Sequence, residues 1–393
     1  MSARRAAADG GAGGPAAGRA GGPAGGRSAA PAAGHAARLA RCRELLARLR
    51  LDALLVSDPL DVRYLTGFRG EDAVLLVTAA EALLCTDSRF WAQVREEVVV
   101  AGLSELRDDD LLAHAAGEVA RLAGAGARLG YQGGHLRHAE FRRLRRAHRG
   151  GLRDVGGRVT RLRAVKDAAE VAALRQAAAV TDAALQAVVG RGLAGRRERD
   201  VAWDLVSEYH RLGAEGEAFP AIVAGGAHGA QAHAIPGERV LARGDLVVID
   251  TGARVDGYCA DITRTYAVGE PGEEARRVYD VVLAAQRAGL AAVRAGAHGR
   301  DDVDAAARAV VVAAGYGETF GHGTGHGVGL EVHEAPALGR RHGDRLEAGM
   351  VCTVEPGVYL EGRFGVRIED TVLVTADGCE PLTRTPKELT VVD

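Results

Sequence analysis

Acidic side chains stand directly beside short apolar runs in the last third of the chain, where folded proteins normally bury uncharged residues. The set comprises four carboxylates and one imidazole: Asp250, Asp261, His326, Glu355 and Glu369. A carboxylate carried inward by a buried strand needs a compensating cation. Carboxylate oxygens can bridge two ions and offset their mutual repulsion, so this set suits a pair of hard or borderline divalent cations. The pattern predicts a two-metal site, and two metals in turn suggest hydrolysis.

Length and composition predict two domains preceded by a tail. A chain of 393 residues exceeds what one hydrophobic core usually serves. Residues 1–34 are rich in Ala, Gly, Pro and Arg without hydrophobic periodicity, so we expect them to be disordered. Their Arg-rich, acid-poor character also resembles an organellar transit peptide, but they lack an amphipathic apolar face.

Several functional classes are disfavoured by composition. The net charge of -2 argues against a nucleic-acid surface, and no stretch approaches the roughly 20 apolar residues needed to cross a bilayer. The five cysteines are scattered, with no C-x-x-C pair, which fits a reducing cytoplasm. We therefore expect a soluble, cytoplasmic protein without a nucleic-acid or membrane partner.

Periodicity indicates α/β organisation in the first half and mixed elements in the second. Short apolar runs predict strands at 53–56, 73–77 and 82–85, and helical spacing predicts a helix at 111–122. Asp167 is predicted to cap a long helix with Glu170 reaching back, and further helices are expected at 203–212, 278–293 and 303–314. The expected strands of this half are 221–224, 246–249, 262–268, 351–354 and 371–374.

The segment LVVIDTGARVDGYCADITRTYAV places Asp250 and Asp261 at the ends of two strands that can face each other. Strand pairing would bring the two carboxylates within a few ångströms, where their repulsion would raise one pKa unless a cation neutralised them. The alternative is two turn aspartates that cap local backbone amides.

The segment FGHGTGHGVGLEVHEAP holds His322, His326 and His333 among glycines that allow close backbone approach. A structural histidine usually occurs singly, whereas a glycine-flanked cluster more often binds metal or substrate. In VCTVEPGVY and GVRIEDTVLV, Glu355 and Glu369 interrupt β-branched runs. Arg367 lies two residues before Glu369, so a simple ion pair between them is the alternative to a metal for Glu369 and leaves Glu355 unexplained.

In order and local context, the five predicted ligands resemble those of the pita-bread metallopeptidases, which include methionine aminopeptidase, Xaa-Pro aminopeptidase and prolidase. The resemblance covers about residue 161 to the C-terminus. Upstream, DALLVSDPLDVRYLTGFRG and LLCTDSRFW resemble the N-terminal domain of the Xaa-Pro branch. The resemblance implies an α+β chain with an N-terminal creatinase-like α/β domain over residues 35–158 and a C-terminal pita-bread (creatinase/aminopeptidase) fold over residues 159–393.

The resemblance also implies roles for individual residues. Asp261 and Glu369 would bridge two metals, Asp250 would complete one coordination sphere, and His326 with Glu355 would complete the other. A hydroxide between the metals would attack the substrate, and Glu355 would carry the proton to the leaving nitrogen.

Further side chains match residues of the family that are not ligands. His233 and His333 match two histidines that hydrogen-bond the substrate carbonyl or the oxyanion, although either can instead be a packed imidazole. His322 matches a histidine near the proline side of the cleft. Arg367 is expected either to orient a carboxylate or to form a structural salt bridge.

By resemblance, the substrate is a peptide or dipeptide with proline in the second position. Two divalent ions are implied, Mn²⁺ by family habit, with Co²⁺, Zn²⁺ or Fe²⁺ also compatible with the ligands. A homodimer or homotetramer is the implied assembly. The sequence leaves open whether the chain is a dipeptidase or an aminopeptidase. The rival functions are a non-catalytic pita-bread binding module and a creatinase-like amidinohydrolase, which would not require four inward carboxylates.

Overall fold

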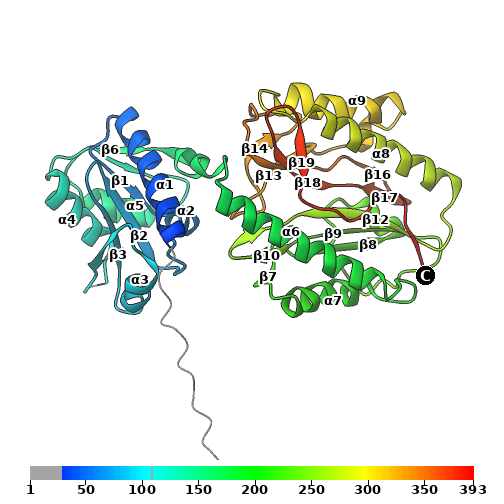
Figure 1. The fold of residues 1–393 in the computed structure, drawn as a ribbon, viewed down its shortest axis with the longest axis horizontal. Helices are drawn as coiled ribbons and strands as arrows, with labels where there is room; N and C mark the ends of the chain where they lie inside the picture. The colour runs from blue at the N-terminus through cyan, green and yellow to red at the C-terminus, as the bar shows by residue number, and fades with distance from the viewer. Residues whose placement is uncertain (1–28, 108) are drawn as a thin grey trace, which may run out of the picture.

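The computed structural model describes residues 29–107 and 109–393 and folds them into two domains (Figure 1). The N-terminal domain is built on one six-stranded mixed sheet in the order β4-β3-β2-β1-β5-β6. Its strands are β1 (Ala53–Val56), β2 (Ala73–Thr78), β3 (Ala82–Thr86), β4 (Gly102–Glu105), β5 (Leu129–Tyr131) and β6 (Leu152–Asp154). Its helices are α1 (Ala29–Arg48), α2 (Pro59–Thr66), α3 (Trp91–Glu97), α4 (Leu111–Ala123) and α5 (His138–Ala147). The three predicted strands and the helix predicted at 111–122 are confirmed.

Helices cover both faces of this sheet because alternate residues of a strand point to opposite sides. Leu54 and Val56 of β1 belong to the apolar cluster that also contains buried residues of α1 and α2. Ala53 and Leu55 belong to a second cluster with buried residues of α4 and α5. A strand buried on both faces needs a continuous apolar run, which is why the ALLV sequence was recognisable.

The tail predicted for residues 1–34 overlaps the first helix. Helix α1 begins at Ala29, so residues 29–34 are helical, and residues 1–28 lie outside the described residues. Alanine has the highest helix propensity, and Pro31 falls in the first turn, where a missing N–H costs little. The composition that suggested disorder is therefore compatible with a helix start.

The C-terminal domain places two curved sheets between pairs of helices (Figure 1). One sheet has the order β20-β12-β9-β8 and the other the order β14-β13-β15-β18-β19. These strands are β8 (Ile222–Gly225), β9 (Leu246–Thr251), β12 (Ile262–Val268), β13 (Gly325–Gly327), β14 (Glu334–Leu338), β15 (Val351–Val354), β18 (Asp370–Val374), β19 (Cys379–Pro381) and β20 (Val391–Val392). Smaller sheets join β7 (Gly216–Glu217) with β10 (Ala253–Val255) and β11 (Tyr258–Cys259), and β16 (Gly357–Leu360) with β17 (Phe364–Arg367).

The helices of this domain flank the sheets from two sides. Helices α6 (Ala168–Val189) and α7 (Glu198–Arg211) share an apolar cluster with β8 and β9, whereas α8 (Glu273–Ala292) and α9 (Ala305–Ala313) lie on the other side in Figure 1. The helices predicted at 203–212 and 278–293 are confirmed, each with an earlier start. The helix predicted at 303–314 is α9, which continues from a π-helical turn at Gly299–Asp304. No helix within the described ranges is long and apolar enough to cross a membrane.

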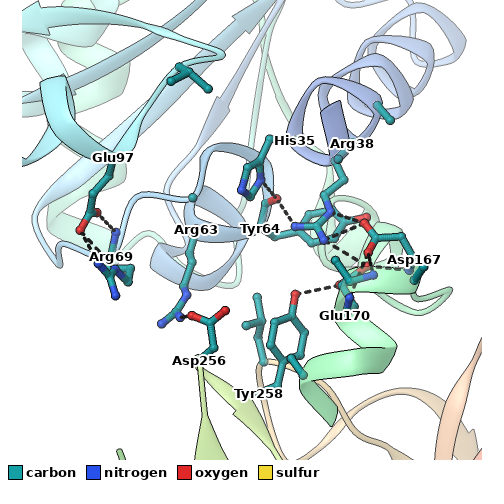
Figure 2. Close-up of a pocket in the computed structure, with 18 of the residues that line it drawn as sticks. His35, Arg38, Arg63, Tyr64, Arg69, Glu97, Asp167, Glu170, Asp256 and Tyr258 are labelled. Atoms are coloured by element: carbon teal, nitrogen blue, oxygen red, sulfur yellow. Dashed lines mark hydrogen bonds and ion pairs between the residues drawn. The ribbon is translucent and has the colours of Figure 1, made fainter. Parts of the chain in front are cut away.

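The start of α6 confirms the predicted capping box and also joins the domains. The Asp167 carboxylate accepts hydrogen bonds from the amides of Ala169 and Glu170, each at 3.0 Å, and Glu170 accepts one from the Asp167 amide at 2.9 Å. Asp167 also binds Arg38 of α1 at 2.7 Å, and Glu170 accepts a hydrogen bond from Tyr258 at 3.1 Å (Figure 2). These residues line a cavity of about 750 Å³ at the junction of the two domains.

Replacing Asp167 by alanine should therefore destabilise the protein in two ways. The loss of a helix cap costs about 1 kcal/mol, and the buried Arg38 guanidinium loses one of its two carboxylate partners as well. Asp110→Ala is the matched control, because Asp110 caps α4 through the Ala113 amide at 3.1 Å. Urea unfolding should show a larger loss for Asp167→Ala than for Asp110→Ala. Equal losses would mean that the Arg38 contact adds nothing.

Candidate metal centre

Two antiparallel strands bring the first pair of predicted ligands together. Strands β9 and β12 pair so that Asp250 lies opposite Thr263, and Asp261 directly precedes β12. Asp250 lies inside β9, which extends two residues beyond the predicted strand. The expectation that strand pairing would bring these two aspartates to the same end of a sheet is confirmed.

The other three predicted ligands come from the second sheet. His326 lies on β13, Glu355 directly follows β15, and Glu369 directly precedes β18. Because β15 and β18 are antiparallel with Val354 opposite Asp370, the end of one strand meets the start of the other. Two sheets therefore present their ligands to one shared space.

All five predicted ligands line one cavity of about 300 Å³. Asp261, His326 and Glu369 can each place one ligating atom within 4.8 Å of the others. The His326 Nε2 atom lies 3.3 Å from Glu355 Oε1 and 3.6 Å from Asp261 Oδ2. Asp250 Oδ1 is buried and has no hydrogen-bond partner, which is unusual for a carboxylate oxygen in a protein interior.

The electrostatics of the cavity fit a bound cation. Burial raises the pKa of Asp261 and of Glu369 well above their usual range, and neighbouring carboxylates raise both further. Burial also raises the pKa of Glu355 and lowers that of His326. Without a cation these acids would take up protons, whereas a divalent ion would favour the ionised form. Clustered oxygens, one imidazole and an orphaned carboxylate oxygen together fit divalent metal binding.

Threonine hydroxyls orient several of these ligands. Thr263 donates to Glu369 at 2.8 Å, and Thr353 donates to Glu355 at 3.4 Å while accepting from the His326 amide at 3.1 Å. Sequence reasoning did not select these threonines, because a threonine in a strand is ordinarily explained by its β-propensity. Their place in the strand-like runs next to the acids is the one available signal.

The ion pair considered for Arg367 and Glu369 is not formed. Arg367 is buried and binds Asp250 at 2.5 Å, and it also donates to the Tyr359 hydroxyl at 2.7 Å. The alternative was wrong because the Arg367 guanidinium extends to Asp250 on β9, whereas Glu369 accepts a hydrogen bond from Thr263, whose hydroxyl also contacts Arg367. Arg367 contacts the set of ligands at a different carboxylate from the one expected.

The three histidines predicted to act on substrate also line the cavity: His233, His322 and His333. The ring of His333 lies 4.2 Å from the ring of His326, measured between centroids. His322 Nε2 lies 2.9 Å from the Tyr359 hydroxyl. Burial lowers the pKa of His322 and of His333, so both rings favour the neutral form that can donate one hydrogen bond and accept another.

Sequence reasoning missed Tyr359, which joins His322 to Arg367 through its hydroxyl. Burial raises the pKa of Tyr359 to about 12, so the hydroxyl stays protonated. Apolar side chains that sequence reasoning also missed complete the lining: Phe219, Ile222 and Val332. The only signal for Tyr359 was its place on the strand that follows Glu355 in the segment VEPGVYL.

Comparison with known proteins gives a family for both domains. The model for metallopeptidase family M24 matches residues 172–376, and the model for the creatinase/prolidase N-terminal domain matches residues 38–165. The chain is 35% identical over 356 residues to the uncharacterized peptidase YqhT of Bacillus subtilis, covering 90% of this chain and 100% of that protein.

Solved structures give the same result. A structure of the Xaa-Pro dipeptidase from Bacillus anthracis matches with a TM-score of 0.88 and 36% identity, covering 91% of this chain and 100% of that one. A structure of the X-Pro aminopeptidase from Thermotoga maritima matches with a TM-score of 0.82 and 37% identity, covering 88% and 99% respectively. The chain therefore belongs to metallopeptidase family M24, with a pita-bread catalytic domain behind a creatinase/prolidase N-terminal domain.

Proposed function

We propose that the chain is a two-metal exopeptidase that hydrolyses the bond between the first residue of a peptide and a proline in the second position. The observation that carries the proposal is the convergence of five ligating side chains in one cavity, supplied by both sheets of the catalytic domain. The names of the two structural relatives, an Xaa-Pro dipeptidase and an X-Pro aminopeptidase, support the proline-directed substrate.

The ligands proposed for the metals are Asp250, Asp261, His326, Glu355 and Glu369, with Asp261 and Glu369 as the shared pair. When bound, two divalent ions activate a water molecule and polarise the scissile carbonyl. The oxygen-rich donor set suits Mn²⁺ among the first-row metals. In this proposal Arg367 holds Asp250 in place, and Thr263 holds Glu369.

Glu355 is proposed to move the proton. It accepts a proton from the attacking water and delivers it to the proline nitrogen as the carbon–nitrogen bond breaks. The leaving nitrogen of an Xaa-Pro bond departs poorly until it is protonated, so the transfer is essential to turnover.

The three cavity histidines are proposed to bind substrate. His233 and His333 would donate hydrogen bonds to the substrate carbonyl or the oxyanion, and His322 would lie beside the proline. An Xaa-Pro bond has no N–H, so an enzyme for it has to recognise the carbonyl and the ring instead. The apolar residues Phe219, Ile222 and Val332 supply surface that suits a proline ring.

The direct test compares Ala-Pro with a longer peptide that begins Ala-Pro, each with Mn²⁺ and with a chelator. Release of alanine that requires Mn²⁺ is the expected result, and the relative rates on the two substrates would separate dipeptidase from aminopeptidase activity. If the fully metallated protein hydrolyses neither peptide, the proposal is wrong and a binding module is favoured. Unchanged turnover after removal of all metal would favour creatinase-like chemistry.

Metal removal should make stability depend on pH. In chelated protein the raised pKa values of Asp261 and Glu369 mean that the native state holds more protons than the unfolded state, where the ordinary values are 3.8 and 4.5. The free energy of unfolding should then fall as the pH rises above about 4 toward the raised values, and saturating Mn²⁺ should abolish that fall. Denaturant unfolding across this pH range measures the effect.

Asp261→Asn should flatten the pH dependence of the chelated protein, because it removes one of the titrating carboxyls while keeping the side-chain shape. The same variant should bind less metal, as measured by elemental analysis. Asp280→Asn is the control, since Asp280 is exposed on α8 and should change neither quantity. Two tightly bound ions in Asp261→Asn would contradict the bridging role.

Glu355→Gln should lower kcat by at least about a hundredfold at saturating Mn²⁺, because positioned proton transfer contributes about that much to a rate or more. KM should change far less, since the amide fills the same space. Steady-state kinetics on Ala-Pro, with metal content measured in parallel, separate loss of proton transfer from loss of metal. A rate within about twofold of the original, in metallated protein, would exclude Glu355 as the proton carrier.

A further inference from the structure

The loop between β13 and β14 contributes side chains both to the metal cavity and to the cavity at the junction of the two domains. Val332 and His333 line the metal cavity, whereas Leu330 lines the cavity between the domains, which Figure 2 shows. The position of His333 within the loop therefore bears directly on the catalytic cavity. Among the described residues, the His333 side chain makes no hydrogen bond of its own, so its place depends on what holds the loop.

The buried side chain of Arg163 binds this loop on both sides of His333. The Arg163 guanidinium binds Glu331 at 2.5 Å and Glu334 at 2.8 Å through its Nη2 atom, and its Nε atom lies 3.3 Å from Glu334. Arg163 is 1% exposed, and the Glu334 side chain is 2% exposed. A guanidinium held by two carboxylates is fixed in orientation because its donors form a rigid fork.

The other arm of the same guanidinium reaches the N-terminal domain. Arg163 Nη1 donates to Asp61 of α2 at 2.9 Å, and Asp61 is fully buried. The second oxygen of Asp61 accepts hydrogen bonds from Gln132 at 2.6 Å and Thr160 at 2.8 Å. Asp61 is thus held by Gln132 of its own domain and by Thr160, which lies in the same helical turn as Arg163. Arg163 therefore links this fixed carboxylate to the loop between β13 and β14.

The pairing of buried positive and negative charges opposes any movement of the loop between β13 and β14. Lys166, whose side chain is fully buried, binds the free oxygen of Glu334 at 2.8 Å. Two buried cations, Arg163 and Lys166, thus face two buried carboxylates, Asp61 and Glu334, with the half-exposed Glu331 at the edge. Moving the loop away would leave a buried charge unpaired, which is strongly unfavourable.

We propose that Arg163 is a positioning residue for His333. By holding Glu331 and Glu334, it fixes the position of the His333 ring relative to the His326 ring. Through its contact with Asp61, it makes that position depend on the N-terminal domain. The inference rests on the proposed function, in which His333 contacts the reacting carbonyl of the substrate. The expected effect on the rate arises from the position of His333, because a misplacement of about 1 Å at a catalytic group can lower the rate about a hundredfold.

The experiment is a double-mutant cycle between Glu331 and His333 on Ala-Pro with Mn²⁺. Glu331→Gln removes the negative charge of the half-exposed partner of Arg163, and so weakens the contact, at little cost to folding. We expect it to lower kcat about tenfold when His333 is present and less than about twofold in the His333→Ala background, because two residues that act through one group are not additive. An equal fold-change in both backgrounds would overturn the proposal.

Arg163→Lys is the second variant, since it keeps the buried positive charge but loses the fork. The loss of kcat in Arg163→Lys should likewise be larger when His333 is present than in the His333→Ala background. The amount of bound metal should be unchanged. Glu380→Gln is the matched control: Glu380 is also 42% exposed and is bound by Arg175 at 2.8 Å, but it lies outside the cavity. Its kcat should be unaltered. If neither Glu331→Gln nor Arg163→Lys depends on His333, Arg163 has a structural role only.

A readout independent of turnover separates this inference from the proposed function. Crystal structures of the original chain and of Arg163→Lys should differ in the separation of the His326 and His333 rings, which is 4.2 Å between centroids in the intact chain. Failure of the original chain to cleave Xaa-Pro peptides would count against the proposed function alone. An unmoved loop in Arg163→Lys would count against the positioning role alone.

Discussion

The structure depends on keeping several carboxylates close together inside a protein. Asp261 and Glu369 are almost completely buried and face Asp250 and Glu355 across one small cavity. Burial and mutual repulsion both favour the protonated form, so the ionised cluster requires positive charge. Arg367 supplies one such charge at Asp250, and the set of acids as a whole, Asp250 included, fits divalent cations. The two sheets, the threonine hydroxyls and the glycine-rich approach to His326 all serve to hold these acids against one another.

The N-terminal domain contributes to the same centre from a distance. None of its described residues lines the metal cavity, yet Asp61 binds Arg163, and Arg163 binds residues on both sides of His333. A second contact, from Arg38 to Asp167 and Glu170, fixes the start of α6. Charged groups are costly to bury singly, so an interface built from them has few alternative arrangements. This offers a physical reason why the catalytic domain depends on its contact with the N-terminal domain.

Particular elements show how far the sequence could be interpreted. The strand at 53–56 and the capping box at Asp167 were predictable because each is a local pattern with one physical explanation. Strands β4, β5 and β6 were not predicted, since three or four residues with few β-branched side chains carry little signal. The start of α1 was misplaced because alanine and proline suit both a disordered tail and the first turn of a helix.

The chemical identity of the centre can be inferred from the residues alone, because acids and histidines set into apolar runs are conspicuous in any fold. Their order along the chain is enough to indicate the family. Which side chains share a partner became apparent only in the folded molecule. Arg367 binds Asp250 rather than Glu369, Tyr359 joins His322 to Arg367, and Arg163 spans residues more than a hundred positions apart. Local patterns record what a residue needs, such as a cap, a buried face or a counter-charge. The group that meets that need is selected when distant segments pack, because contact depends on distance in space and not on separation along the chain.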